Sequence, residues 1–274
     1  MKIFGLVGEK LSHSMSPEIH NEIFKLLKEN AVYNLFEVDE DNVSEVGDAL
    51  RVLNIKGINV TIPYKEELIN SVDELSQEAE KIGAINTILN KDGVLKGYNT
   101  DYYGFGRMLK NFNVNLKNKV VVVLGNGGAA KAVVQYVADQ NPKDILIVAR
   151  NKVKAKNSFK KYDVINYDEL VNIRGDIILN TTPVGMYPKA GVSVVDGSVI
   201  EKFNIAVDLI FNPFETEFLR IAREKGLKTI GGLYMLVGQA IKAEEIWLGK
   251  EISEEDEMII YKKLKYIMEG KNWI

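Results

Sequence analysis

Apolar residues along the chain recur at two alternating spacings. Short aliphatic and β-branched runs typical of strands lie at 3–7, 32–38, 57–62, 85–89, 120–124, 145–149, 176–180, 205–208 and 229–230. Between them, apolar positions follow helical periodicity at 17–29, 43–53, 102–110, 129–138, 152–161, 215–225, 233–248 and 254–268. Strands that alternate with helices predict an α/β fold with mostly parallel sheets.

Charge and composition exclude several classes of protein that could have an α/β fold. The net charge of −3 lacks the basic excess typical of nucleic-acid binders, so we expect no nucleic-acid partner. The absence of Cys excludes disulfides and thiolate ligands, and His13 and His20 alone predict no metal site. No apolar run approaches the roughly 18 residues of a membrane span, and the N-terminal run is too short for a signal peptide. We therefore expect a cytoplasmic protein with no membrane partner.

A glycine-rich turn connects the strand at 120–124 to the helix at 129–138. The turn reads Gly125-Asn126-Gly127-Gly128-Ala129-Ala130. Glycines let the backbone approach a pyrophosphate, and the helix N-terminus offers it N–H groups and a positive dipole. The turn predicts a Rossmann-like dinucleotide-binding domain. The alternative interpretation is a structural turn that binds nothing.

The end of the next strand bears on the choice of cofactor. NAD-selective folds usually place Asp or Glu there to bind the ribose 2′-hydroxyl. Here the strand at 145–149 is followed by Arg150 and Asn151, with Lys154 close behind. The planar guanidinium of arginine suits a 2′-phosphate, so this basic cluster favours NADP over NAD. The alternative is a set of solvated charges, although cations at a helix start are unfavourable without a nearby anion.

Polar residues gather at strand ends in the first hundred residues. Ser14 and Ser16 lie between the first strand and the first helix, and Ser16 before Pro17 also suits a helix N-cap. Further polar residues follow at 57–65, 83–87 and 97–101. Because α/β folds bind ligands at the carboxyl ends of strands, these residues predict a pocket for a small hydroxylated molecule.

Taken together, the motifs resemble the shikimate dehydrogenase family, whose members reduce 3-dehydroshikimate to shikimate with NADPH in chorismate and aromatic amino-acid biosynthesis. The matching pieces, in order, are Ser14-x-Ser16-Pro17, Asn59-x-Thr61-x-Pro63-x-Lys65, Asn86-Thr87, Asn99-Thr100-Asp101, the glycine turn, Asn180-Thr181-Thr182-Pro183-x-Gly185-Met186 and the run from Gly232 through Gln239-Ala240. They cover nearly the whole chain.

The resemblance implies a role for each matching residue. Lys65 and Asp101 would form the catalytic pair, with the lysine as proton donor in ketone reduction and the carboxylate orienting it. Substrate binding is implied for Ser14, Ser16, Asn59, Thr61, Lys65, Asn86, Asp101 and Gln239. Cofactor binding is implied for Gly125, Asn126, Gly127, Gly128, Ala129, Ala130, Arg150, Asn151, Lys154, Thr181, Thr182, Met186, Leu209 and Gly232.

A new strand–turn–helix unit begins at Lys119, which places the expected domain boundary near Asp101. We expect a substrate-binding catalytic α/β domain over residues 1–101 and an NADP-binding Rossmann domain over 102–238. C-terminal helices over 239–274 are expected to pack back on the first domain.

The sequence also departs from the family pattern. Asn151 stands where a threonine is usual, Phe211 where a tyrosine can reach the substrate carboxylate, and Tyr234 where glycine is usual near the nicotinamide pocket. Two other functions stay open: a quinate/shikimate dehydrogenase of broader specificity, and a non-catalytic NADP-sensing regulator. The expected assembly is a monomer or a homodimer.

Overall fold

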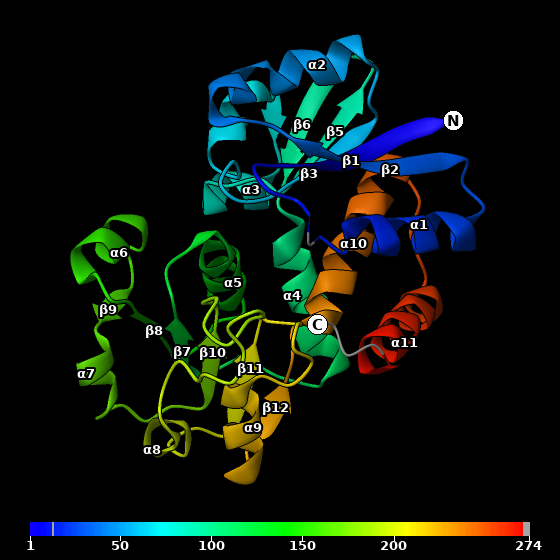
Figure 1. Ribbon diagram of the computed structural model, residues 1–274. Coiled ribbons are helices and arrows are strands. Elements are labelled where there is room, and N and C mark those ends of the chain that lie inside the picture. The colour runs from blue at the N-terminus through cyan, green and yellow to red at the C-terminus, as the bar shows by residue number, and fades with distance from the viewer. Residues whose placement is uncertain (13, 271–274) are drawn as a thin grey trace. The chain divides into compact units, whose positions relative to one another are not determined.

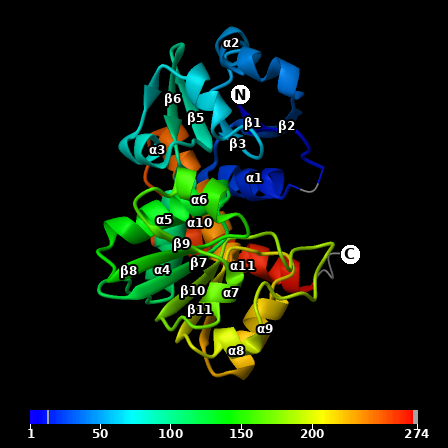
Figure 2. The same cartoon turned by 90° about the vertical axis from the view of Figure 1, so that its left-hand side faces the viewer.

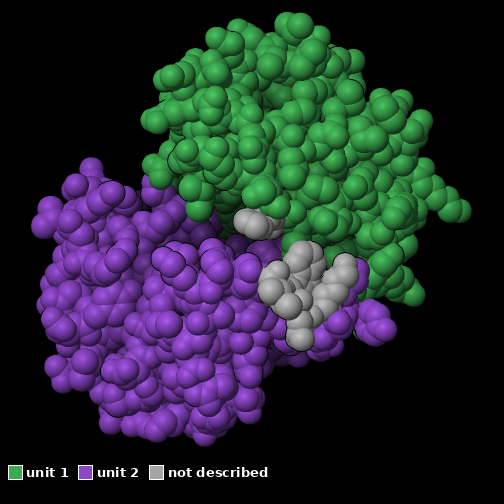
Figure 3. All heavy atoms as spheres, in the orientation of Figure 1, with its two compact units in different colours: residues 1–104, 237–264 green, residues 105–236, 265–274 purple. Residues whose placement is uncertain are grey.

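The computed structural model describes residues 1–12 and 14–270, so His13 lies outside the described residues. The chain divides into two compact units (Figure 1, Figure 3). Unit 1 comprises residues 1–104 and 237–264, and unit 2 comprises residues 105–236 with the chain from Lys265 onward. The boundaries expected from sequence lay at 101/102 and 238/239. The end of the last helix, from Lys265, belongs to unit 2 and not to unit 1.

Unit 1 contains a six-stranded mixed sheet with the order β2-β1-β3-β5-β6-β4. Its strands are β1 (Lys2–Gly8), β2 (Ala31–Glu37), β3 (Gly57–Val60), β4 (Glu74–Leu75), β5 (Thr87–Lys91) and β6 (Val94–Tyr98). β1 pairs in parallel with β2 and β3, whereas β5 runs antiparallel to both β3 and β6. The hairpin β5–β6 turns at Asp92 and Gly93, which both have positive φ as a two-residue turn requires. The strand β6 was not predicted from the hydrophobic pattern, although this Asp-Gly pair is its local signal.

The sheet of unit 1 buries a hydrophobic cluster on each face. Its helices are α1 (Ser16–Leu27), η1 (Glu40–Glu45), α2 (Val46–Val52), η2 (Glu67–Ser71), α3 (Gln77–Ile82), the start of α4 (Thr100–Asn111), most of α10 (Leu233–Leu248) and the first part of α11 (Glu254–Gly270). Val7 packs in the cluster beneath η1 and α2, whereas Phe4 and Leu6 pack with residues of α1 and α10, because successive strand residues face opposite sides. A Cβ on Gly57 would meet Trp247 Nε1 at 2.2 Å, so the glycine of β3 allows α10 to approach closely.

Unit 2 contains a six-stranded parallel sheet with the order β12-β11-β10-β7-β8-β9 (Figure 2). Its strands are β7 (Val120–Leu124), β8 (Asp144–Val148), β9 (Asp163–Ile165), β10 (Ile177–Asn180), β11 (Ile205–Asp208) and β12 (Lys228–Ile230). The helices are α5 (Gly128–Asp139), α6 (Lys152–Ser158), α7 (Tyr167–Leu170), α8 (Gly197–Ile200) and α9 (Glu217–Glu224). This strand order is that of the Rossmann fold. The predicted α/β class with a Rossmann-like second domain is confirmed. Residues 237–264 belong to unit 1, as expected for C-terminal helices that pack back on the first domain.

No helix within the described residues is long and apolar enough to cross a membrane. In residues 1–12 and 14–270, no three His, Cys, Asp or Glu side chains come together as metal ligands would.

Candidate functional site

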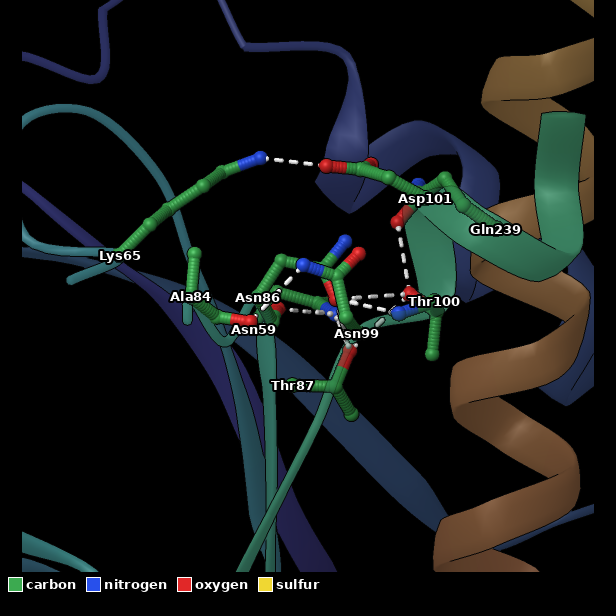
Figure 4. Close-up of polar contacts among 9 residues, drawn as sticks. All are labelled: Asn59, Lys65, Ala84, Asn86, Thr87, Asn99, Thr100, Asp101 and Gln239. Atoms are coloured by element: carbon green, nitrogen blue, oxygen red, sulfur yellow. Dashed lines mark hydrogen bonds and ion pairs between the residues drawn. The ribbon is translucent and has the colours of Figure 1, made fainter. Parts of the chain in front are cut away.

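A lysine and a carboxylate meet in unit 1 at the end of the sheet. Lys65 follows β3 through a turn, and Asp101 lies in the first turn of α4. Lys65 Nζ lies 2.6 Å from Asp101 Oδ2, and the two side chains expose only 18% and 13% of their surface (Figure 4). A partly buried pair of this kind holds an ammonium in a fixed position while leaving it accessible to a ligand.

The Asn86 side chain fixes the start of the helix that carries Asp101. Its Oδ1 accepts the backbone N–H of Thr100 at 2.6 Å and is also 3.1 Å from the hydroxyls of Thr87 and Thr100. The Thr100 hydroxyl in turn donates to Gln239 Oε1 on α10 at 3.4 Å. The structure therefore joins Asn86, Gln239 and the helix turn that carries Asp101 in one network (Figure 4). Thr100, which lies within a motif but received no role from the sequence, is its central link.

Asn59 on β3 belongs to the same network. Its Nδ2 donates to Asn86 O at 3.2 Å and to Thr87 Oγ1 at 3.0 Å, and its Oδ1 accepts the Tyr33 hydroxyl at 2.7 Å. Thr61, which directly follows β3, is half-buried and pairs through its backbone N–H with Val7 O. No side-chain hydrogen bond among the described residues joins Thr61 to this network.

Ser14 and Ser16 form a separate local turn before α1. The Ser14 hydroxyl donates to Ser16 Oγ at 3.1 Å and accepts the Ser16 N–H at 3.2 Å. Ser16 is the first residue of α1, and its N-cap is Met15. Interpreting Ser16 as the N-cap was therefore wrong, and its hydroxyl is not used to cap the helix.

In unit 2, the glycine turn lies where the dinucleotide motif predicts. Gly125 has a φ of 108°, and a Cβ there would meet Thr181 Oγ1 at 2.8 Å. Gly127 is the N-cap of α5, supplies no side-chain hydrogen bond to the helix, and has no atom within 4 Å of the position that a Cβ would occupy. The open space and the uncapped N–H groups of α5 fit a pyrophosphate.

The basic residues after β8 differ in their environments. Arg150 and Lys154 are exposed, whereas Lys152 Nζ is paired with Glu169 at 2.8 Å. Asn151 is the N-cap of α6, and its Oδ1 accepts the Lys154 N–H at 2.9 Å. Asn151 thus has a structural role through its oxygen, and its amide NH₂ is the part suited to a phosphate.

The buried carboxylate of Asp208 is connected through Asn180 to Thr182, one of the predicted cofactor residues. Thr182 Oγ1 donates to Asn180 Oδ1 at 2.7 Å, and Asn180 Nδ2 donates to Asp208 Oδ1 at 3.0 Å. The other Asp208 oxygen accepts the Thr216 hydroxyl at 2.7 Å. Burial raises the pKa of Asp208 to about 6, against the opposing effect of these hydrogen bonds. No local pattern indicates a role for Asp208, because its partners Asn180 and Thr216 lie at the end of β10 and at the N-cap of α9.

The remaining predicted cofactor residues lie around the ends of β10 and β11. Thr181 Oγ1 donates to Leu124 O at 2.7 Å, which ties its loop to β7. Gly232 packs directly on Leu209, since a Cβ there would lie 2.0 Å from Leu209 O. Met186 is 44% exposed. Tyr234 is buried, with its ring edge-on to Phe112 at 6.1 Å.

The strand order and glycine turn of unit 2 define a class of protein, the dinucleotide-binding Rossmann proteins. Comparison with known proteins gives the family. The model of the shikimate dehydrogenase substrate binding domain matches residues 6–88, and that of shikimate / quinate 5-dehydrogenase matches residues 107–182. The chain belongs to the shikimate dehydrogenase family.

Individual relatives match over nearly their full length. A shikimate dehydrogenase (NADP(+)) of Clostridium perfringens is 50% identical over 97% of this chain and 99% of its own. A chorismate mutase/shikimate 5-dehydrogenase fusion protein of Clostridium acetobutylicum has a TM-score of 0.96 at 49% identity, covering 98% of this chain and 99% of that chain. The Thermus thermophilus shikimate 5-dehydrogenase, solved in complex with NADP(H) and shikimate, has a TM-score of 0.86 at 29% identity, covering 96% and 99%.

Proposed function

We propose that the protein catalyses the reversible NADPH-dependent reduction of 3-dehydroshikimate to shikimate, a step of aromatic amino-acid biosynthesis. The observation that carries this proposal is the 2.6 Å pair of Lys65 and Asp101, held by the Asn86–Thr100 network in a chain of this family. A protein that only sensed NADP would have no need of a proton-transfer pair.

The reaction needs a hydride, which the cofactor supplies, and a proton, which the Lys65–Asp101 pair supplies. Bound NADPH supplies a hydride to the ketone carbon of the substrate. The carbonyl oxygen then develops negative charge, and the Lys65 ammonium donates a proton to it. Asp101 orients the ammonium and balances its charge. In shikimate oxidation, Lys65 takes the proton of the alcohol and therefore acts first as a base.

Substrate selection rests on the polar residues of unit 1. Ser14 and Ser16 bind the carboxylate through hydroxyls that are not used to cap α1. Asn59, Thr61, Asn86 and Gln239 bind the hydroxyls of the ring, together with Lys65 and Asp101. This set suits a small hydroxylated acid.

Cofactor binding rests on unit 2. Residues 125–130 receive the pyrophosphate, and Arg150, Asn151 and Lys154 receive the 2′-phosphate that distinguishes NADP from NAD. Thr181, Thr182, Leu209 and Gly232 complete the proposed cofactor site, with Met186 on its nicotinamide side. We propose further that the protein acts in the cytoplasm as a monomer or homodimer, without a nucleic-acid partner.

The decisive experiment measures nicotinamide absorbance with shikimate or quinate, each with NADP⁺ or NAD⁺. Shikimate with NADP⁺ is expected to give the highest kcat/KM. Comparable rates with quinate or NAD⁺ would instead establish the broader quinate/shikimate dehydrogenase. NADP binding with no shikimate-dependent absorbance change would establish the regulator and overturn the proposal.

A further inference from the structure

A fully buried ionisable pair lies behind the substrate residues of unit 1 and has no role in the chemistry above. His20 on α1 and Glu244 on α10 expose none of their side-chain surface, and His20 Nδ1 lies 2.6 Å from Glu244 Oε1. The rings of Phe24, Tyr33 and Trp247 surround His20, with centroids at 6.5, 4.1 and 5.4 Å. Burying two such groups among aromatic rings costs stability unless they are well paired.

The surroundings determine the protonation state of this pair. Burial lowers the pKa of His20 to about 3, and burial also raises the pKa of Glu244 well above its usual value. Lys2 and Glu29 act on Glu244 in opposite directions, while the groups facing His20 are the neutral side chains of Asn59 and Tyr33. Both groups are therefore uncharged: the protonated Glu244 carboxyl donates from Oε1 to His20 Nδ1, and the one ring hydrogen of the neutral His20 is on Nε2.

The hydrogen bond to Glu244 fixes the rotation of the His20 ring, and the ring fixes Tyr33. The His20 and Tyr33 rings are stacked with an interplanar angle of only 7°. Tyr33 is buried and carries its hydroxyl to Asn59 Oδ1 at 2.7 Å. A change in the plane of the His20 ring would therefore tilt the phenol away from Asn59.

The Asn86 carbonyl and the Tyr33 hydroxyl together hold the Asn59 amide in one orientation. Asn86 O can only accept a hydrogen bond, so Asn59 Nδ2 faces it, and Asn59 Oδ1 faces Tyr33. Ser16 also acts on Tyr33 as a side-chain hydrogen-bond partner. Ser16 and His20 are four residues apart on α1 and so share one face of the helix. One buried cluster thus contacts both the proposed carboxylate site and the proposed hydroxyl site.

We propose that Glu244, His20 and Tyr33 are positioning residues of the substrate site, which anchor the oxygen of the Asn59 amide and hold Ser16 in place. The inference rests on the proposed function, because it concerns the binding of shikimate. It assigns these residues to substrate affinity and leaves hydride and proton transfer to other groups.

Four variants test the proposal through the KM for shikimate. Tyr33→Phe keeps the stacked ring and removes only the hydroxyl, so the KM is expected to rise about 5- to 10-fold, the effect of losing one hydrogen bond. Glu244→Leu is expected to raise the KM similarly. The amide of Glu244→Gln can still donate to His20 Nδ1, so this variant should have a KM for shikimate close to that of wild type. The control is Phe24→Leu, which perturbs the same cluster without touching a hydrogen bond and should lower thermal stability only.

The KM and kcat separate positioning from stability. A purely structural role would lower the amount of active enzyme, and hence the apparent kcat, while leaving the KM for shikimate at the wild-type value. If Tyr33→Phe and Glu244→Leu both show an unchanged KM, the positioning role is overturned; should Glu244→Leu fail to fold, Tyr33→Phe decides alone. Absence of shikimate turnover in the wild-type protein would overturn the proposed function and this inference together, whereas the variants affect only the inference.

Discussion

Lys65 Nζ and Asp101 Oδ2 lie 2.6 Å apart, which fastens the turn after β3 to the first turn of α4. The pair depends on the placement of α4, since Asn86 Oδ1 accepts the Thr100 N–H immediately before Asp101. The position of Asp101 relative to Lys65 is thus set by the Asn86 side chain, which holds the start of α4.

Replacing Lys65 with Met is expected to lower kcat for shikimate oxidation by about 10²- to 10⁴-fold, because it removes the group that transfers the proton. Shikimate binding, measured by calorimetry, should weaken far less than kcat falls. The matched control is Lys96→Met, since Lys96 forms an exposed ion pair with Glu74 in the same unit at 3.0 Å and should leave turnover unchanged. Near-normal kcat in Lys65→Met would contradict the catalytic assignment.

Arg150→Gln is expected to raise the KM for NADP⁺ by about 10- to 150-fold while leaving the KM for NAD⁺ unchanged. A charge-assisted hydrogen bond of about 1.5–3 kcal/mol is lost only with the phosphorylated cofactor. Steady-state kinetics with both cofactors measure the effect. Lys152→Gln serves as control, because Lys152 already pairs with Glu169. An equal increase of the KM for NADP⁺ and for NAD⁺ would show that Arg150 does not bind the 2′-phosphate.

Gly232→Ala is expected to destabilise unit 2 by about 1–3 kcal/mol and to weaken NADP⁺ binding, because its Cβ would lie 2.0 Å from the rigid backbone oxygen of Leu209. Gly231→Ala is the neighbouring control. Its Cβ would meet Phe214 O at 3.4 Å, an ordinary contact. Urea unfolding and cofactor titration of both variants test this, and equal behaviour of the two alanines would refute the packing argument.

The sequence predicted features whose causes are local. The apolar run of β7 followed by Gly125 and Gly127 specifies a strand, a tight turn and an open helix start within a few residues, so the Rossmann-like unit could be predicted. The strand β6 also had a local signal, the Asp92-Gly93 turn, but this signal is a turn sequence and does not appear in the spacing of apolar residues.

Other features depend on contacts between distant segments and left no local pattern. His20 and Glu244 are separated by 224 positions, and each alone resembles an ordinary helix residue. Asp208 ends a strand, but its importance depends on Asn180 and Thr216, which only the folded sheet brings to it. The roles of such residues become visible through burial and hydrogen bonding in the structure.

Asp208 provides a prediction of pH-dependent stability. Its pKa is raised from 3.8 to about 6 in the folded protein, so the folded state holds a proton that the unfolded state has lost between these values. The stability that this group contributes is therefore complete below pH 3.8 and is lost as the pH rises through 6. At about 1.4 kcal/mol per pKa unit, the loss between pH 4 and 7 is about 3 kcal/mol.

Asp208→Asn keeps the shape and the acceptor oxygen but has no proton to lose, so its stability relative to wild type should rise by about 3 kcal/mol from pH 4 to pH 7. Urea unfolding at both pH values, followed by a signal from unit 2, measures the difference, and the titration of other groups cancels in it. Asp176→Asn is the matched control: the Val120 N–H and Lys119 lower the pKa of Asp176 below 3.8, so its titration falls mostly below pH 4 and its stability relative to wild type should change little from pH 4 to pH 7. A difference between Asp208→Asn and wild type that is independent of pH would show that Asp208 is ionised in the folded protein throughout this range.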